Sequence, residues 1–306
     1  MAALWFKNLR LYRITHWPDT SPESLAEAME EQRLKPCGKL EPSSQGWSSP
    51  YGDPADERLV HAANGCMLLR FAMEDRVLPS AVVKQKVTER AAAYKERTGS
   101  KPNRRDAVNL RDEVLMELLP QAFIKPSHVS LYLDPQAGWI VIDTSSQSKA
   151  DDVAVLLKQS LPDLRLQIID APERLRSTMT RWLDDGPSTP DFVLGEECDL
   201  CDQAESRATV KARHVDLDSS EMREHLRAGK IVTRLGLVWK ERLQFALGDD
   251  FSVARLKPED VLAEQFDDLA DVDAITRMDA EFVFMALEVR GLIEALTSTF
   301  EVVSEG

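Results

Sequence analysis

The sequence predicts an α+β protein in which mixed or antiparallel sheets carry flanking helices and one inserted helical module. Three observations support this fold class. Polar and apolar residues alternate along several short segments, which is the pattern of half-buried strands. Between residues 82 and 119 the apolar period becomes helical, and strand patterns resume afterwards. With 306 residues, 43% of them hydrophobic, the chain can bury one large core or two to three smaller ones.

The first 76 residues are predicted to supply the opening strands of a sheet. Asn64-Gly65 is the strongest short hairpin signal in the chain, because both residue types tolerate the backbone of a two-residue turn. Thr20 or Ser21 can cap a helix whose first turn holds Pro22. The predicted elements are a strand over Leu4–Ile14, a helix from Pro22 to about Leu34, a loop over Glu41–Pro54 and two strands within Leu59–Arg76.

A helical pair interrupts the strands. Val82–Arg97 and Asp106–Leu119 are polar and amphipathic, and a turn over Gly99–Asn103 separates them. Strands follow at Val129–Leu133 and Trp139–Asp143. An inserted helical pair of this kind is expected to project from the sheet as a separate finger.

Helices and strands alternate through the rest of the chain. We expect a first α/β sheet domain over 1–76 and 126–170, the finger over 77–125, and a second α/β domain with an acidic C-terminal helix over 171–306. The predicted elements are helices at Lys149–Leu161, Pro172–Asp184, Ser219–Ala228 and Asp273–Phe300, a loop over Gly186–Cys201, and strands at Leu166–Ile169, within Thr209–Leu217, over Ile231–Ala246 and up to Lys257.

The segment Ile231–Ala246 is the most informative one. With a period of two, one face is apolar from Ile231 to Phe245 and is interrupted only by Glu241. A chain with a net charge of -14 has kept a basic surface here, where carboxylates would serve solubility equally well. This asymmetry indicates a polyanionic partner. The other face of this segment carries Arg234, Lys240, Arg242 and Gln244.

Charge is distributed unevenly along the chain. Residues 258–306 hold 13 Asp and Glu against 2 Arg, whereas residues 207–257 hold 11 Lys and Arg against 7 acidic residues. Residues 77–128 hold 10 basic against 6 acidic residues. These two basic segments predict that polyanion binding is confined to one surface, although charges of this number are also found on ordinary solvated faces.

Several function classes lack their signatures. The sequence has no G-x-G-x-x-G, G-x-x-x-x-G-K-[ST] or G-x-S-x-G motif, so no NAD, ATP or serine hydrolase chemistry is expected. Its five histidines are scattered without a metal-binding pair. The pair Cys198-x-x-Cys201 has zinc-ligand spacing but lacks two further ligands, so two incidental loop cysteines are favoured and no metal or other cofactor is expected.

The sequence also indicates where the protein works. Charged residues interrupt the apolar stretch at the N-terminus, and no run of roughly 18 apolar residues occurs, so neither a signal peptide nor a membrane span is expected. Its four cysteines are then expected to be reduced thiols. Cytoplasm is the predicted location.

Two groups of residues leave alternatives open. Asp134, Asp143 and Lys149 come nearest to the carboxylates and lysine of a metal-dependent nuclease, but their spacing is loose, so helix-capping and solvated roles are favoured. Phe123, close to Lys125 in a proline-bounded segment, has the aromatic and basic character of nucleic-acid surfaces. An aromatic side chain in that place can also anchor the finger to the core or to a partner chain.

A series of short motifs resembles the RdgC family of recombination-associated proteins over nearly the whole chain. No single motif is decisive, but together, in this order and at matching spacing, they are specific. They are Leu4-Trp5-Phe6-Lys7-Asn8-Leu9 with Tyr12; Pro36-Cys37-Gly38 with Gly46-Trp47; His61 with Ala63-Asn64-Gly65; Leu78-Pro79-Ser80 with Val83-Lys84; Asp112-Glu113-Val114-Leu115 with Leu118-Leu119-Pro120 and Ala122-Phe123; Gly229-Lys230 with Val232-Thr233, Leu235, Leu237 and Trp239; and Asp279 with Phe282.

The resemblance implies a ring-shaped homodimer, associated with the nucleoid, that encircles DNA. Such a protein binds double- and single-stranded DNA without sequence preference, restrains RecA-promoted strand exchange, and has no enzymatic activity or catalytic residues. Phosphate neutralisation by lysine and arginine fits this expectation. A metal-dependent DNA-processing enzyme and a protein-interaction dimer without DNA binding are the alternatives.

The resemblance also implies roles for single residues. Phe123 matches the phenylalanine at the family's dimer gate. The family's Lys-Gln pair for DNA contact falls at His214-Val215, so this chain departs from the pattern there. Lys211 and Arg213 are the expected substitutes. The full set of expected DNA contacts is Lys211, Arg213, His214, Arg234, Lys240, Arg242, Lys84, Lys86, Arg104 and Arg105.

Overall fold

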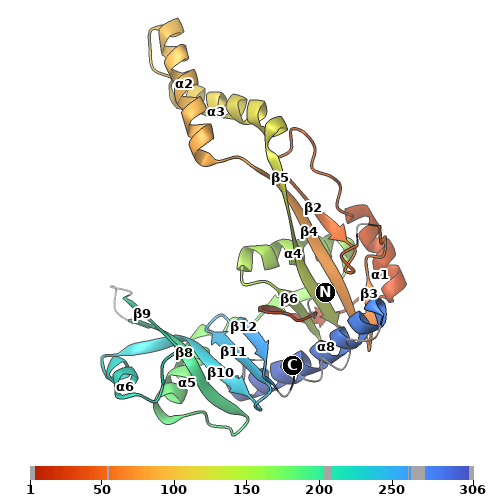
Figure 1. Ribbon diagram of the computed structural model, residues 1–306, viewed down its shortest axis with the longest axis vertical. Helices are drawn as coiled ribbons and strands as arrows, with labels where there is room; N and C mark the ends of the chain where they lie inside the picture. Colours follow the sequence, from red (N-terminus) through yellow and green to blue (C-terminus); the bar gives the residue numbers. More distant parts are fainter. Residues whose placement is uncertain (1–3, 54, 203–207, 261, 263–272, 303–306) are drawn as a thin grey trace. The chain divides into compact units, whose positions relative to one another are not determined.

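The computed structural model describes residues 4–53, 55–202, 208–260, 262 and 273–302 (Figure 1). They divide into two compact units. Unit 1 comprises Met1–Ala28, Val60–Leu69 and Ser130–Gly306, and unit 2 comprises Met29–Leu59 and Arg70–Val129. The expected α+β class with antiparallel strands is confirmed, while the three domain boundaries drawn from the sequence stay a prediction.

The antiparallel sheet of unit 1 has the strand order β4-β5-β6-β1-β12-β11-β10-β8-β9. Strands β4 and β5 contribute only residues 66–69 and 130–134 to this unit, and their other residues belong to unit 2. Strand β3 pairs with the beginning of β4, and β7 pairs with β1. The strands are β1 (Leu9–His16), β3 (His61–Ala63), β4 (Cys66–Val77), β5 (Phe123–Asp134), β6 (Trp139–Asp143), β7 (Arg165–Ile168), β8 (Phe192–Asp202), β9 (Thr209–Arg213), β10 (Lys230–Trp239), β11 (Leu243–Gly248) and β12 (Val253–Pro258). Its helices are α1 (Pro22–Met29), α4 (Gln147–Ser160), α5 (Pro172–Asp185), α6 (Ser220–Arg227) and α8 (Ala274–Phe300).

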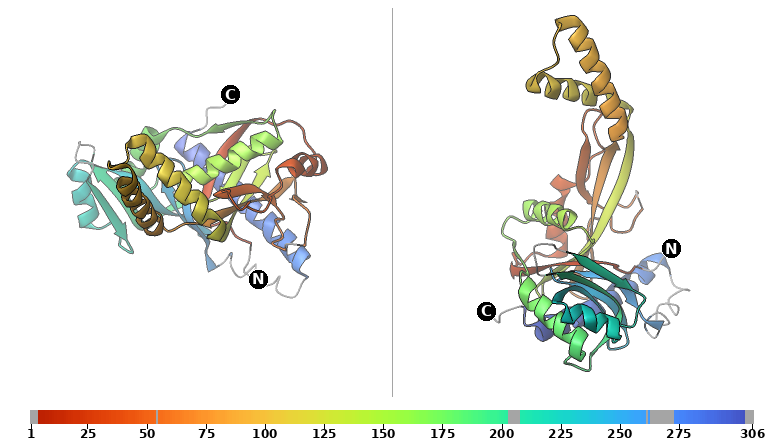
Figure 2. Two further views of the ribbon diagram at one scale, coloured as in Figure 1. Left: turned by 90° about the horizontal axis from the view of Figure 1, so that it is seen from above. Right: turned by 90° about the vertical axis from the view of Figure 1, so that its left-hand side faces the viewer.

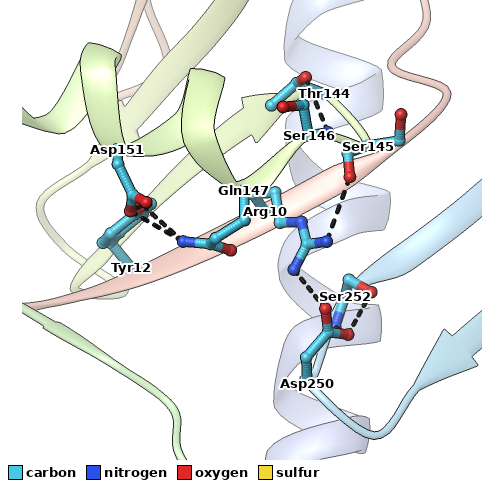
Figure 3. Close-up of polar contacts among 9 residues, drawn as sticks. All are labelled: Arg10, Tyr12, Thr144, Ser145, Ser146, Gln147, Asp151, Asp250 and Ser252. Carbon is cyan, nitrogen blue, oxygen red and sulfur yellow. Dashed lines mark hydrogen bonds and ion pairs between the residues drawn. The ribbon is translucent and has the colours of Figure 1, made fainter. Parts of the chain in front are cut away.

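Helices cover both faces of the sheet around β1. Leu11 belongs to the apolar cluster that also contains the buried side chains of α8. The next residue, Tyr12, points the other way and donates its hydroxyl hydrogen to Asp151 of α4 at 2.7 Å (Figure 3). Burial, followed by this contact with Asp151, raises the pKa of Tyr12 well above its ordinary value. Strand β6 is correspondingly apolar on both sides, as expected of a strand buried between two layers.

The strands β8 to β12 are covered on one face by α5 and α8 (Figure 2). Trp239 of β10 packs against Gly291 of α8, and Trp182 of α5 contacts Phe300 at a centroid distance of 4.9 Å. The opposite face of these strands carries polar and charged side chains, and we refer to it as the open face. The open face consists of Glu197, Asp199, Lys211, Arg213, Arg234, Gln244, Arg255 and Lys257.

Unit 2 combines a strand pair with the helical finger (Figure 1). Strand β2 (Ser43–Ser48) pairs with β4, and a short 3-10 helix spans Glu30–Gln32. The finger consists of α2 (Ser80–Thr98) and α3 (Arg104–Leu118), close to the predicted bounds, followed by a 3-10 turn over Leu119–Gln121.

The two finger helices bury little apolar surface against one another. Val114 is the one fully buried side chain among the described residues of the pair. A left-handed Gly99 ends α2, and a capping box between Asn103 and Asp106 begins α3. Arg90 also pairs with Glu117 at 2.7 Å. Capping and polar contacts therefore support this hairpin more than a core does.

Three predicted elements are wrong. The strand over Ile231–Ala246 is a hairpin, because Lys240 and Glu241 take positive φ values of 50° and 55° and turn the chain between β10 and β11. The predicted loops over Gly186–Cys201 and Glu41–Pro54 contain strands β8 and β2. By contrast, the hairpin at Asn64-Gly65 is confirmed.

No helix in the described ranges is long and apolar enough to cross a membrane.

Candidate nucleic-acid interface

Strand β9 places two expected DNA contacts on the open face. Lys211 and Arg213 are two residues apart, so they point to the same side, while Val210 and Ala212 pack against the core. Lys211 is exposed and lies opposite Asp199 of β8. Arg213 is half-buried, and its guanidinium lies 2.6 Å from Asp199 and 3.3 Å from Glu197. Lys211 is therefore open to a ligand, whereas Arg213 is already paired.

Two β-bulges shape the middle of this face. On β8, the residues between Leu194 and Cys198 lie opposite Gly236 alone, so the strand bulges there. On β12, Arg255 takes a positive φ of 54° where the register with β11 shifts. Bulges re-aim side chains, and these two direct Glu197 and Arg255 toward each other, with an Nη2 to Oε1 distance of 2.6 Å.

A groove of about 390 Å³ runs between these side chains. Gly195 and Gly236 form its floor, and a Cβ atom on Gly236 would lie 2.7 Å from Glu197 Cγ. The two glycines thus keep the backbone accessible and leave room for the Glu197 side chain. The charged and amide side chains along the groove are those of Glu196, Glu197, Arg213, Gln244, Arg255 and Lys257, together with His214.

Positive charge exceeds negative charge on the open face. Its five basic side chains face two carboxylates, which leaves an excess of three positive charges. Lys211, Lys257 and Arg234 make no ion pair with another described residue. The Arg234 Nε atom is buried without a hydrogen-bond partner in the described part of the chain. These three cations are the ones available to a polyanion.

Lys240 and Arg242 lie elsewhere than expected. Both belong to the β10–β11 turn instead of the sheet face. Lys240 Nζ lies 3.5 Å from Asp191 and 5.1 Å from the centre of the Trp239 ring. Arg242 donates from Nε to Glu288 of α8 at 3.0 Å, and this contact raises the pKa of Arg242 above its ordinary value. The prediction that Lys240 and Arg242 share one strand face with Arg234 is therefore wrong.

His214 lies at the end of β9 with a positive φ of 54° and a side chain that is 93% exposed. Its Nδ1 atom is 3.8 Å from Glu196. It lies beside the groove, where its ring is open to solvent.

The remaining expected contacts lie in unit 2. Lys84 on α2 is exposed, and Lys86 lies 3.6 Å from Glu117. Arg104 and Arg105 are exposed in the first turn of α3. They form a separate basic group on the finger.

Phe123 begins β5 with a side chain that is 87% exposed. Other large apolar side chains of the finger and its base are exposed as well. They are Val77, Val82, Val108, Met116 and Ile124. These side chains are distributed over β4, α2, α3 and β5, so each of these elements exposes at least one large apolar side chain.

Sequence reasoning missed Glu197, Arg255 and Lys257 as members of the site. The residues that make the bulges could have pointed to them, since Gly195 precedes two glutamates and Gly236 interrupts the apolar alternation of β10. A bulge changes the face on which later residues lie, so alternation alone cannot assign that face.

The carboxylates proposed for a nuclease have structural partners. Asp134 is 2% exposed and accepts a hydrogen bond from Arg290 Nε at 2.7 Å. Asp143 accepts hydrogen bonds from the backbone N–H groups of Lys7 and Asn8, and its burial raises its pKa. Since Asp134 lies opposite Trp139, Asp143 is four residues further along β6, roughly 13 Å away at the rise of a strand.

The described residues contain no group of three His, Cys, Asp or Glu side chains that could hold a metal ion. Cys198 and Cys201 lie in β8, not in a loop. A spacing of three in a strand directs them to opposite faces. Burial raises the pKa of Cys198 to about 12. Cys198 lies in the core while Cys201 is on the other side of the strand, so their side chains point apart.

Comparisons with known proteins agree over almost the whole chain. Residues 4–303 match a family model described as "Putative exonuclease, RdgC". Proteins named recombination-associated protein RdgC are similar to it: that of Tolumonas auensis is 37% identical over 96% of this chain and 97% of its own length. The counterpart in Pseudoalteromonas atlantica is 33% identical over 97% and 98%, and that of Salmonella paratyphi B is 34% identical over 96% of both. This chain belongs to the RdgC family.

Proposed function

We propose that the protein binds double- and single-stranded DNA without sequence preference, as a homodimer that closes into a ring. The observation that carries this proposal is the open face, where Lys211, Lys257 and Arg234 stand without acidic partners in the described chain. Lysine and arginine neutralise phosphates whatever the base sequence, and the released counterions make the affinity dependent on salt. Base-specific readout needs side chains that enter a groove of the duplex, whereas a sheet face suits the backbone.

A second copy of the chain is the partner that we propose for the finger. Phe123 and the exposed apolar residues around it are costly to leave in water. A contact between two identical fingers would bury the same surface on both copies, as in most homodimers. Closure of this contact around a DNA strand would slow dissociation without any increase in local affinity.

Restraint of RecA-mediated recombination is the proposed biological role, and it is supported by the word "recombination-associated" in the relatives' names. A protein that covers DNA irrespective of sequence competes with any filament that forms on the same strand. This role needs no chemical step and no cofactor.

The test is titration of a labelled duplex over a series of salt concentrations. We expect the logarithm of the binding constant to fall linearly with the logarithm of salt concentration. Lys211→Ala is expected to make the slope of this line about one unit less steep, by the same amount for every DNA sequence tested. Binding that does not depend on salt, or that depends on base sequence, would contradict the proposal.

A metal-dependent exonuclease is the second candidate, because the matching family model carries that description. Incubation of end-labelled duplex with Mg²⁺ or Mn²⁺ tests it. Cleavage that is lost in Asp143→Asn, with the fold intact, would favour the enzyme. Cleavage that persists in this variant would point to a contaminating nuclease.

A further inference from the structure

Glu197 lies between two arginines in the groove of the open face. Its Oε1 atom accepts a hydrogen bond from Arg255 Nε at 2.9 Å and lies 2.6 Å from Nη2 of the same side chain. Its Oε2 atom lies 3.3 Å from Arg213 Nε. One carboxylate thus holds two guanidinium groups, and only 20% of its side chain is exposed.

The backbone around this carboxylate is irregular in three places. A bulge on β8 brings Glu197 over β10, a glycine at 236 leaves space for its Cγ, and Arg255 has a left-handed backbone. A non-glycine residue with positive φ has a strained backbone. Because the irregularities converge on one ion-pair cluster, the position of the carboxylate is a specific feature of this fold.

Arginines bind a phosphate in the same way, because two guanidinium groups can share one oxyanion. We propose that Glu197 occupies the position of a DNA backbone phosphate between Arg213 and Arg255, and that bound DNA displaces it. This inference rests on the proposed DNA binding and adds a specific regulator of its strength. Lys211 and Lys257 would meet phosphates first. Arg255 becomes available only when the carboxylate leaves, and Arg213 then keeps its ion pair with Asp199 while its side toward Glu197 is opened.

In this proposal Glu197 lowers the affinity of the open face for DNA. Removing the Glu197 charge should free Arg255 and leave Arg213 with Asp199 as its one remaining carboxylate partner in the cluster, which increases both the affinity and the number of phosphates engaged. An ordinary structural ion pair predicts the opposite, because its loss would disorder Arg213 and Arg255 and weaken binding.

The experiment compares Glu197→Gln with Glu196→Gln on a short fluorescent duplex over a salt series. Glu196 is a matched control, since it is the neighbouring residue in the same groove, its side chain is 72% exposed, and among the described residues that side chain forms an ion pair only with His214, at 3.8 Å. For E197Q we expect affinity to rise roughly tenfold and the salt slope to steepen by about one unit, because Arg255 is freed while Arg213 keeps Asp199. For E196Q we expect less than a twofold rise, with an unchanged slope.

The same substitution in an Arg213→Ala/Arg255→Ala background tests the mechanism. In this background E197Q should raise the affinity for DNA no more than E196Q does, because the arginines beside Glu197 are absent. Glu197→Asp provides a variant without a change in net charge, and its shorter side chain should also raise affinity. Circular dichroism and thermal melting establish that each variant is folded.

Equal effects of E197Q and E196Q, or a gain that survives the loss of both arginines, would overturn this inference while leaving salt-dependent DNA binding intact. Weaker binding by both E197Q and E197D would assign Glu197 a purely structural role. If the wild type and E197Q both failed to bind at every salt concentration, the proposed function would fall together with the inference.

Discussion

Arg242 and Glu288 join the β10–β11 turn to α8 through a hydrogen bond from Nε to Oε2 at 3.0 Å. The side chain of Glu288 is only 14% exposed, so the arginine compensates a largely buried carboxylate. This contact removes Arg242 from the cations that DNA can reach.

Arg242→Ala should therefore lower stability and leave DNA binding unchanged. We expect a loss of about 1–2 kcal/mol in the free energy of unfolding, because Glu288 would remain buried without its partner. Urea denaturation measures the loss of stability. DNA binding over a series of salt concentrations shows whether the salt slope equals that of the wild type. Lys240→Ala is the control, since its ion pair is half exposed and should contribute less than about 1 kcal/mol. A flatter salt slope in Arg242→Ala would show that this guanidinium contacts phosphate after all.

Phe123→Ala should affect assembly without affecting the fold of the single chain. A side chain that is 87% exposed adds little to the stability of the monomer, so we expect a change within about 0.5 kcal/mol. Light scattering should show a shift from dimer to monomer. Ile168→Ala is the control: it removes an apolar side chain of unit 1 that is 54% exposed and should leave the mass unchanged. An unaltered dimer in Phe123→Ala would exclude the proposed finger contact.

Arg290→Ala should be among the most destabilising single changes in unit 1. It leaves Asp134, which is 2% exposed, without its ion-pair partner, and removing one member of a buried pair costs about 3–5 kcal/mol. The double variant Asp134→Asn/Arg290→Met should recover a large part of that loss, because no buried charge remains. Thermal denaturation of the three proteins is the measurement, and a double variant no more stable than Arg290→Ala would refute this explanation.

Two buried thiols should make stability fall at alkaline pH. Burial raises the pKa of Cys66 from 9.0 to about 11 and that of Cys198 from 9.0 to about 12. Below pH 9 each thiol is protonated in both the folded and the unfolded chain. As the pH rises above 9, the unfolded chain loses the proton first, so the folded state becomes relatively less stable.

Cys198→Ala should remove the part of this pH dependence that the Cys198 thiol causes. Between pH 8 and pH 11 the free energy of unfolding should fall by about 2 kcal/mol more in the wild type than in the variant. Denaturant titrations at both pH values measure the difference. Parallel losses in the two proteins would mean that the Cys198 thiol ionises in the folded protein as readily as in the unfolded one.

The sequence predicted the elements whose signals are local. Asn64-Gly65 marks a turn by residue type, and the apolar period of α8 extends over the whole helix, so both were found with close bounds. The turn at Lys240-Glu241 was missed because neither residue is typical of a left-handed turn and the apolar alternation continues through it. Strand β8 was missed because Gly195 and its acidic neighbours resemble a loop.

The candidate site was predictable only in part. Lys211 and Arg213 follow from alternation within one short strand, which needs no knowledge of its neighbours. The cluster of Glu197, Arg213 and Arg255 depends on two bulges and on pairing between strands far apart in the chain, which no local pattern encodes. Ion pairing also decides which arginines are available, and a sequence lists charges without their partners.

Retention on circular and linear DNA tests most directly whether two copies of this chain enclose the strand. The wild-type protein is loaded at low salt onto closed circular DNA and onto the same DNA after a single cut, and both complexes are then challenged with high salt. A closed ring predicts that protein remains on the circle and is lost quickly from the linear molecule, where it can slide off an end. Equal loss from both forms would show that the protein binds DNA from one side, and it would contradict encirclement.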